Sequence, residues 1–178
     1  MIDTVCIKTI NELIVELEEQ EKKYYPRILK SLQIPIEKFY NIAEWDADHY
    51  SRVCLAKNKK FELILLCWNG YDQTPIHDHD GQKCWVYQLA GQIEEKRYDL
   101  VDDNEPVEVL STKLTPRNLT YMDDNMGCHA LINSSPKRSL TLHLYVNPIE
   151  KCSVYFEDSE EFQTKEMSYC KDLSGLEN

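Results

Sequence analysis

The segment GYDQTPIHDHDGQKCWVYQLAG, residues 70–91, decides the fold prediction. A glycine stands at each end, and between them the pair His77 and His79 precedes a run rich in aromatic and β-branched residues. Such a run between turn residues predicts a β-strand. Because successive side chains of a strand point to opposite faces, His77 and His79 share one face and Asp78 points to the other. Two imidazoles on one face can bind one metal ion.

Similar runs follow one another from Tyr50 onward. They are separated roughly every ten residues by turn-forming Asn, Gly, Asp and Pro. Many short strands with closely spaced turns indicate an antiparallel sandwich or barrel. The predicted strands are FELILLCW (61–68), KCWVYQLA (83–90), QIEEKRYDL (92–100), VEVLSTKL (107–114), CHALIN (128–133) and SLTLHLYVN (139–147).

The start of the chain has a helical pattern instead. Apolar residues recur there at helical spacing, at Ile10, Leu13, Ile14 and Leu17. A chain of 178 residues is long enough for one ordinary domain. We therefore expect a single domain over 1–178, with helices in 1–48, a β-barrel in 49–156 and a loosely packed polar tail in 157–178.

The charge and composition of the chain indicate which kinds of partner and which cellular compartment to expect. The formal net charge of −11 argues against nucleic acid and against anionic membranes. The longest apolar run, 63–68, is too short to span a bilayer, and the first residues lack the basic-then-apolar order of a signal peptide. The seven cysteines form no CxxC pair, which disfavours a zinc finger. We expect a cytoplasmic monomer with mostly free thiols.

The third ligand of the metal site has to come from another segment, and His129 is the candidate. The surroundings of His77 and His79 resemble the first cupin motif, and Gly127-Cys128-His129 followed by Asn133 resembles the second. Cupins are small double-stranded antiparallel β-barrels, in agreement with the predicted strands. The resemblance implies a mainly β fold, a single cupin barrel with N-terminal helices.

One departure from the cupin pattern bears on the chemistry. In most cupins a carboxylate ligand lies where this sequence has Cys84. Three neutral imidazoles leave a divalent iron its full positive charge and up to three open positions, which favours a thiolate ligand. Asp78 does not replace the carboxylate, because it points to the wrong face. A carboxylate ligand would instead indicate a 2-oxoglutarate or ring-cleaving oxygenase.

Over more than half of its length the chain resembles the cysteine dioxygenase family. In that family a cysteine follows the HxH pair, here Cys84, and a Ser-x-His-x-Tyr strand comes later, here Thr141, His143 and Tyr145. The resemblance implies a thioether between Cys84 and Tyr145. Threonine keeps the hydroxyl of the serine that it replaces. The three residues alternate along one strand, so Thr141 could fix the tautomer of His143, and His143 could orient the Tyr145 hydroxyl.

The segment Tyr50-Ser51-Arg52 matches the family's substrate element, in which a tyrosine precedes an arginine by two positions. The resemblance implies that Arg52, with Tyr50 beside it, binds the substrate carboxylate, and a guanidinium matches a carboxylate in two parallel hydrogen bonds. Relatives that oxidise 3-mercaptopropionate carry a glutamine here, so arginine indicates cysteine. Trp68 and Cys152 also occupy family positions, and we expect both to serve packing.

The predicted function is oxidation of L-cysteine by O₂ to cysteine sulfinic acid, with one Fe(II) per chain held by His77, His79 and His129. Two alternatives remain: a dioxygenase of another small thiol, 3-mercaptopropionate or cysteamine, and a non-catalytic cupin that binds a metal or small ligand. A sugar or acid isomerase on the same barrel is disfavoured by the missing carboxylate ligand.

Overall fold

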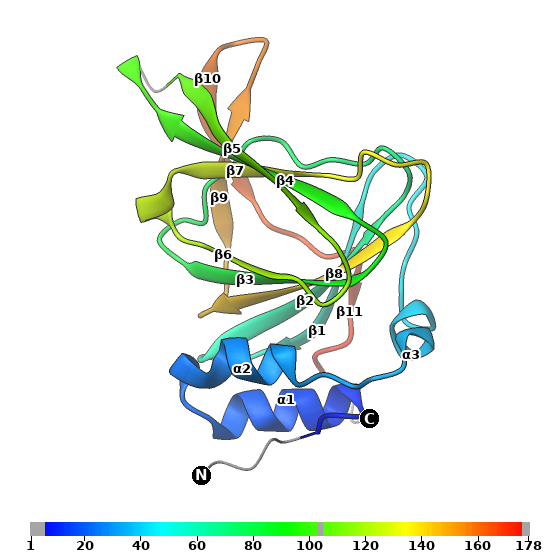
Figure 1. Ribbon diagram of the computed structural model, residues 1–178. Coiled ribbons are helices and arrows are strands. Elements are labelled where there is room, and N and C mark those ends of the chain that lie inside the picture. Colours follow the sequence, from blue (N-terminus) through cyan, green and yellow to red (C-terminus); the bar gives the residue numbers. More distant parts are fainter. Residues whose placement is uncertain (1–5, 103–104, 176–178) are drawn as a thin grey trace.

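The structure is a computed structural model that describes residues 6–102 and 105–175 (Figure 1). Within these residues, three short α-helices precede the β-strands, and two 3-10 turns lie at Lys22–Tyr24 and Asp124–Met126. The helices are α1 Ile10–Glu19, α2 Tyr25–Lys30 and α3 Ile36–Tyr40. The strands are β1 Ser51–Lys57, β2 Phe61–Trp68, β3 Lys83–Ala90, β4 Ile93–Leu100, β5 Pro106–Leu114, β6 Leu119–Met122, β7 Cys128–Ile132, β8 Ser139–Val146, β9 Lys151–Phe156, β10 Glu161–Glu166 and β11 Lys171–Asp172.

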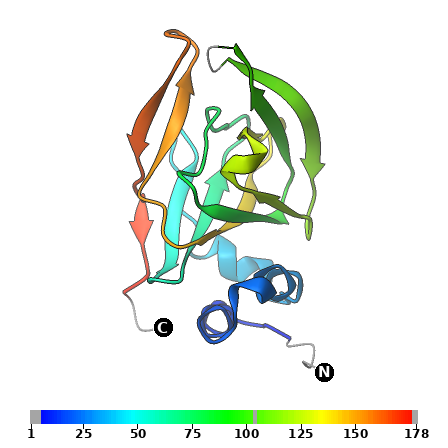
Figure 2. The same cartoon turned by 90° about the vertical axis from the view of Figure 1, so that its left-hand side faces the viewer.

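Among the described residues the strands form a six-stranded sheet in the order β11-β1-β2-β8-β3-β6, a three-stranded sheet in the order β5-β4-β7, and the β9–β10 pair. Helices α1 and α2 lie side by side beneath the six-stranded sheet (Figure 1). The β4–β5 and β9–β10 pairs extend towards the opposite end of the molecule (Figure 2). The predicted mainly β barrel with N-terminal helices is confirmed. No helix in the described part of the chain is both long and apolar enough to cross a membrane.

Helix α1 begins where the sequence provides a cap. The side chain of Thr9 accepts a hydrogen bond from the backbone nitrogen of Glu12, which satisfies one of the otherwise unpaired N–H groups of the first turn. Leu13 and Leu17 are one helical turn apart and both are fully buried. The apolar face predicted from the spacing is therefore the face that packs against the sheet.

Strands β2 and β8 are buried along their whole lengths because the six-stranded sheet has a core on each face. Alternation sends Leu140, Leu142 and Leu144 of β8 into the core between the sheet and the helices, while Tyr145 packs in the core inside the barrel. The predicted separation of the leucines from the polar side chains of this strand is confirmed. The polar side chains therefore point into the barrel.

The segment after Glu157 is more ordered than the polar tail that we expected. Strand β10 pairs with β9, and β11 pairs in parallel with β1 through Val53 and Cys54. The backbone nitrogen of Cys170 also donates to the carbonyl oxygen of Arg52, at 2.9 Å. Edge pairing uses backbone groups, so a polar sequence can add a strand without an apolar face. Low hydrophobicity was therefore a poor guide to packing here.

Gly127 immediately precedes Cys128 and His129, and it adopts φ 82° and ψ −146°, a conformation essentially restricted to glycine. A Cβ at this position would collide with the carbonyl oxygen of Tyr98. We expect Gly127→Ala to lower the free energy of unfolding by at least about 2 kcal/mol, as measured by urea denaturation. Gly81 has a φ of 79° but no atom within 4 Å of its would-be Cβ, so Gly81→Ala should cost about 1 kcal/mol. Equal losses in the two variants would contradict this explanation.

Candidate metal centre

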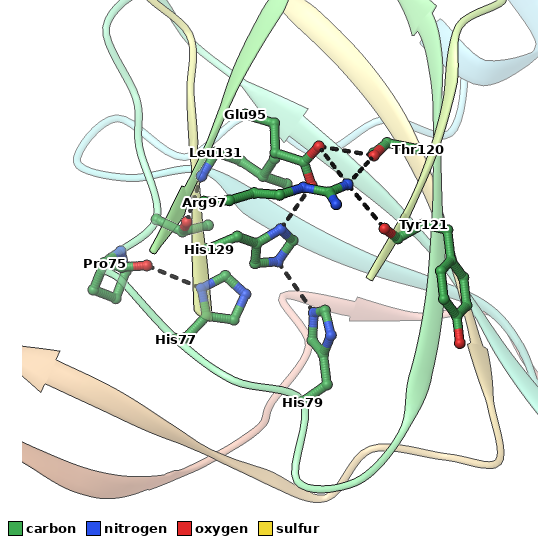
Figure 3. A network of polar contacts seen from close by, with 10 residues as sticks. Pro75, His77, His79, Glu95, Arg97, Thr120, Tyr121, His129 and Leu131 are labelled. Atoms are coloured by element: carbon green, nitrogen blue, oxygen red, sulfur yellow. Dashed lines mark hydrogen bonds and ion pairs between the residues drawn. The ribbon is translucent and has the colours of Figure 1, made fainter. Parts of the chain in front are cut away.

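The imidazoles of His77, His79 and His129 converge inside the barrel (Figure 3). Their candidate ligand atoms all lie within 4.8 Å of one another, and Nε2 of His79 is 3.1 Å from Nε2 of His129. His79 and His129 are each only 1% exposed, and His77 is partly buried. The structure thus brings together the three side chains that the sequence predicted as ligands.

The HxH pair does not lie on a regular strand, which corrects our expectation. His77 instead forms isolated bridges, exchanging backbone hydrogen bonds of 3.0 Å with His129 on β7 and pairing with Val154 on β9. His77 and His79 still point to the same side, with ring centroids 5.6 Å apart, so the predicted alternation holds. Asp78 points away and its Oδ1 accepts a hydrogen bond from the backbone nitrogen of Ser153, at 2.7 Å. It is not a member of the cluster.

Two of the three imidazoles are held by an acceptor at Nδ1. His77 Nδ1 lies 2.9 Å from the carbonyl oxygen of Pro75, and His129 Nδ1 lies 3.0 Å from Oε1 of Glu95. A carbonyl or carboxylate oxygen can only accept, so each Nδ1 carries a hydrogen and Nε2 is the nitrogen that can face a metal. His79 differs, since its Nδ1 is buried without a partner among the described residues.

These residues fit a divalent transition metal. Burial, followed by the nearby His129, lowers the pKa of His77 to about 3 and that of His79 well below its ordinary value. Both rings are therefore neutral at pH 7, which is the form that binds a metal. Neutral imidazole donors suit Zn, Cu, Fe and Ni, and three such ligands would leave one to three coordination positions open, depending on the metal.

Sequence reasoning missed Glu95, which is 1% exposed and lies on β4 behind His129. Burial alone would raise its pKa, but hydrogen bonds from His129 and Thr120 and the charge of Arg97 outweigh burial, so the pKa of Glu95 is lowered. One signal was present in the sequence: Ile93 and Glu95 alternate along β4, which places the carboxylate on the same face as a buried isoleucine.

Cys84 on β3 and Tyr145 on β8 are direct cross-strand partners. Both are buried, with 0% and 3% exposure. Burial raises the pKa of each group above its ordinary value, so both are protonated at neutral pH. The ring of Tyr145 also packs edge-on against His79, with centroids 5.7 Å apart. The predicted thioether pair therefore lies in contact beside the candidate metal ligands.

Thr141 and His143 are joined as the sequence suggested, with 3.0 Å between Oγ1 and Nε2. Trp68, which we expected to serve packing alone, also donates its indole N–H to Thr141 Oγ1, at 2.9 Å. An indole nitrogen can only donate, so the threonine hydroxyl keeps its own hydrogen for His143. The rings of His143 and Tyr145 are stacked with centroids 6.4 Å apart, and no hydrogen bond between them occurs in the described part of the structure.

A small pocket of about 40 Å³ lies beside the histidines. Its lining includes Tyr50, Arg52, His77, His143 and Tyr145, together with Lys165 and Met167 from the segment that we expected to be a loose tail. The substrate residues predicted from the sequence thus line one pocket with a candidate metal ligand. Tyr50 is held there by stacking on Trp68, with ring centroids 5.0 Å apart.

Arg52 is the charged group best placed to bind an anion in this pocket. The residue is 8% exposed, and its Nε donates to the carbonyl oxygen of Ser168, at 3.1 Å. Its Nη2 is buried and has no partner among the described residues. A buried guanidinium nitrogen without an acceptor is costly, which favours an anionic ligand at this point.

Comparisons with known proteins agree with these features. The family profile described as "Cysteine dioxygenase type I" matches residues 5–158. The chain is 26% identical to cysteine dioxygenase type 1 of Danio rerio, covering 92% of this chain and 83% of that protein. It is 31% identical to the Rattus norvegicus enzyme of the same name, covering 65% of this chain and 62% of that protein, so this match spans less than two thirds of the relative.

A solved Klebsiella pneumoniae protein with a double-stranded β-helix domain has a TM-score of 0.51 at 11% identity, covering 72% of this chain and 94% of that one. This likeness shows the fold alone. The family match covers most of the sequence and includes the histidine cluster, the Cys84–Tyr145 pair and Arg52. The chain belongs to the cysteine dioxygenase type I family.

Proposed function

We propose that this protein is a non-haem iron dioxygenase that converts L-cysteine and O₂ to cysteine sulfinic acid. The observation that carries the proposal concerns Arg52, which lines a pocket together with His77. Its buried Nη2 has no hydrogen-bond partner among the described residues. A ligand with a carboxylate at one end and a metal-binding thiolate a few bonds away would satisfy both groups. Family membership supports the same substrate.

We assign one Fe(II) per chain to Nε2 of His77, His79 and His129. When bound, Fe(II) would provide open positions for the substrate thiolate and the redox chemistry that activates O₂. The protein contributes three imidazoles, two of them held at Nδ1 by an acceptor, and a pocket whose small volume leaves little room for bulk water. We propose iron rather than zinc because the family reaction consumes O₂, which the redox-inactive zinc ion does not activate.

The carboxylate end of the substrate, opposite the thiolate that would bind the metal, would be held by Arg52. Nε of Arg52 already donates to the carbonyl oxygen of Ser168. Its Nη2, which has no partner in the part of the chain that the structure describes, would hold the carboxylate, with Tyr50 beside it. Holding both ends of a small molecule limits its motion and brings sulfur and O₂ together, which lowers the entropic part of the barrier. Tyr145 carries its proton at neutral pH and can donate a hydrogen bond to oxygen as negative charge develops. His143 lines the same pocket from the Thr141 side.

We also propose that Cys84 and Tyr145 become joined by a thioether. The bond would link Sγ to a ring carbon next to the hydroxyl, and two hydrogen atoms with their electrons would pass to O₂. Cross-strand contact and shared burial of the two side chains support this step. Intact mass spectrometry of iron-loaded protein exposed to O₂ should show the loss of two hydrogens, and Cys84→Ser should show none.

We further propose a single-domain cytoplasmic monomer. No disulfide joins any of the seven cysteines, all of which lie in the described residues, and a reducing compartment is where cysteines stay unpaired. Size-exclusion chromatography with light scattering would test the oligomeric state, and a dimer at micromolar concentration would contradict it.

The direct test incubates iron-loaded protein with L-cysteine, 3-mercaptopropionate or cysteamine while O₂ uptake and products are followed. We expect one O₂ consumed per cysteine sulfinate, with both oxygens from ¹⁸O₂ in the product. The thiol without a carboxylate, cysteamine, should be a poor substrate because it leaves Arg52 unpaired. Preference for either alternative thiol would change the substrate assignment. Tight metal binding without O₂ uptake for any thiol would indicate a non-catalytic cupin.

A further inference from the structure

The three candidate ligands are supported very unequally. His77 is held by a neutral carbonyl, and Nδ1 of His79 has no partner in the described residues. His129 alone is held by a carboxylate, that of Glu95. A carboxylate behind an imidazole fixes its orientation and increases its basicity towards a metal. The contacts on Glu95 therefore bear on the metal centre more than those behind the other two histidines.

Every oxygen of Glu95 is occupied (Figure 3). Oε1 accepts from His129. Oε2 accepts from the hydroxyl of Thr120, at 2.7 Å, and from Nη2 of Arg97, at 3.1 Å. The carboxylate is thus clamped on its far side by two donors and cannot rotate away from His129 without losing both.

Arg97 is itself fixed between the two sheets. It lies on β4, directly opposite His129 on β7, and it shares the face of Glu95 two residues earlier. Its Nη2 donates to Thr120 Oγ1, at 2.7 Å, and to the carbonyl oxygen of Tyr121, at 2.9 Å, both on β6. Strand β6 belongs to the six-stranded sheet and β4 to the three-stranded sheet. Arg97 therefore sets the position of Glu95 relative to both walls of the barrel.

An ordinary surface ion pair on the same strand provides the contrast. Lys96 points to the other face of β4 and pairs with Glu108, at 2.9 Å, with side chains 30% and 41% exposed. In the Arg97–Glu95 pair the corresponding values are 16% and 1%. Only the buried pair touches a candidate metal ligand.

We propose that Arg97 and Thr120 are positioning residues of the metal centre, acting through Glu95 on His129. They hold the carboxylate in the orientation that keeps the hydrogen on Nδ1 and directs Nε2 to the metal. This inference rests on the proposed metal site and deepens it. It assigns a role to residues behind the site rather than in the pocket that binds substrate.

The test measures metal affinity without cysteine or O₂. Purified full-length protein is titrated with Co(II) in competition with a chromophoric chelator, and the visible spectrum of bound Co(II) is recorded. We expect Arg97→Met to weaken affinity by about 10- to 100-fold and to alter the Co(II) spectrum. Lys96→Met removes the same kind of charge one residue away and should leave both unchanged. Wild-type affinity and spectrum for Arg97→Met would overturn the proposal.

A double-mutant cycle separates positioning from a structural contribution. If Arg97 acts through Glu95, Arg97→Met should have a much smaller effect on Co(II) affinity in a Glu95→Gln background than in the wild type. Equal effects in the two backgrounds would overturn the proposal. The double variant has no unpaired buried charge, so it remains informative if Arg97→Met alone folds poorly. Thr120→Val, which removes one donor only, should weaken affinity in the same direction but less.

The result of the Co(II) binding test does not depend on whether the protein catalyses the proposed reaction. If the wild type binds Co(II) but oxidises no thiol, the proposed function fails while the positioning test can still succeed. If cysteine is oxidised but the cycle is additive, the proposed function stands and this inference fails.

Discussion

His79→Gln is expected to abolish cysteine oxidation and most of the metal binding. His79 contributes one of three candidate ligand nitrogens, and its Nδ1 has no partner within the described residues, so the substitution breaks no hydrogen bond of the ring except the contact with His129. Losing one of three ligands should lower Fe(II) affinity by about 10³-fold or more, and kcat/KM should fall at least as far. Chelator competition and O₂ uptake measure the two quantities.

His49→Gln is the matched control for this substitution. His49 is exposed, and its Nδ1 contacts the carbonyl oxygen of Tyr50 and the carboxylate of Asp46 outside the cluster. Metal content and activity should match the wild type. If His79→Gln retained stoichiometric iron and normal turnover, the assignment of the metal centre to these histidines would be wrong.

Arg52→Gln is expected to raise KM for L-cysteine by about 100-fold, equivalent to about 2.7 kcal/mol, a typical value for losing a charged hydrogen-bond partner in a buried site. The amide of glutamine has no charge and no second parallel donor for a carboxylate. Steady-state O₂ uptake with L-cysteine and with cysteamine should separate the loss of the carboxylate contact from general damage to the site. Because cysteamine has no carboxylate, its kcat/KM should be unchanged or improved by the substitution.

Lys165→Gln removes a positive charge from the same pocket but from an exposed strand. Exposed charges contribute little to binding, so its KM for cysteine should rise less than about threefold. Similar losses in Arg52→Gln and Lys165→Gln would mean that the pocket attracts anions through its general charge rather than through one buried guanidinium. An unchanged KM in Arg52→Gln would remove the carboxylate contact from the proposal.

Much of the fold was predictable because the relevant signals are local. Strand β2 matches its predicted range, and the alternation in β8 predicts which of its side chains enter the barrel. The same period of two places His77 and His79 on one face even though the segment forms isolated bridges instead of a strand. These inferences need only the geometry of an extended chain.

The partners of the site residues were not predictable in the same way. Trp68 donates to Thr141 across 73 positions of sequence, and Glu95 contacts His129 across 34. Ser168, whose carbonyl holds Arg52, comes from a polar segment without a strand-like pattern. Such contacts depend on the register between distant strands, and a sequence pattern gives the face of a residue but not its neighbour across the sheet.

The sequence by itself placed His77 and His79 on one face, because side-chain direction follows from backbone alternation. Its resemblance to a known family then singled out Cys84, Tyr145 and Arg52 as residues of the same site. Only the tertiary structure decided what supports them. The clamp of Arg97 and Thr120 on Glu95 joins two sheets, and the carbonyl of Ser168 reaches Arg52 from the C-terminal segment. Those contacts exist only once the sheets have closed on each other, so no local pattern records them.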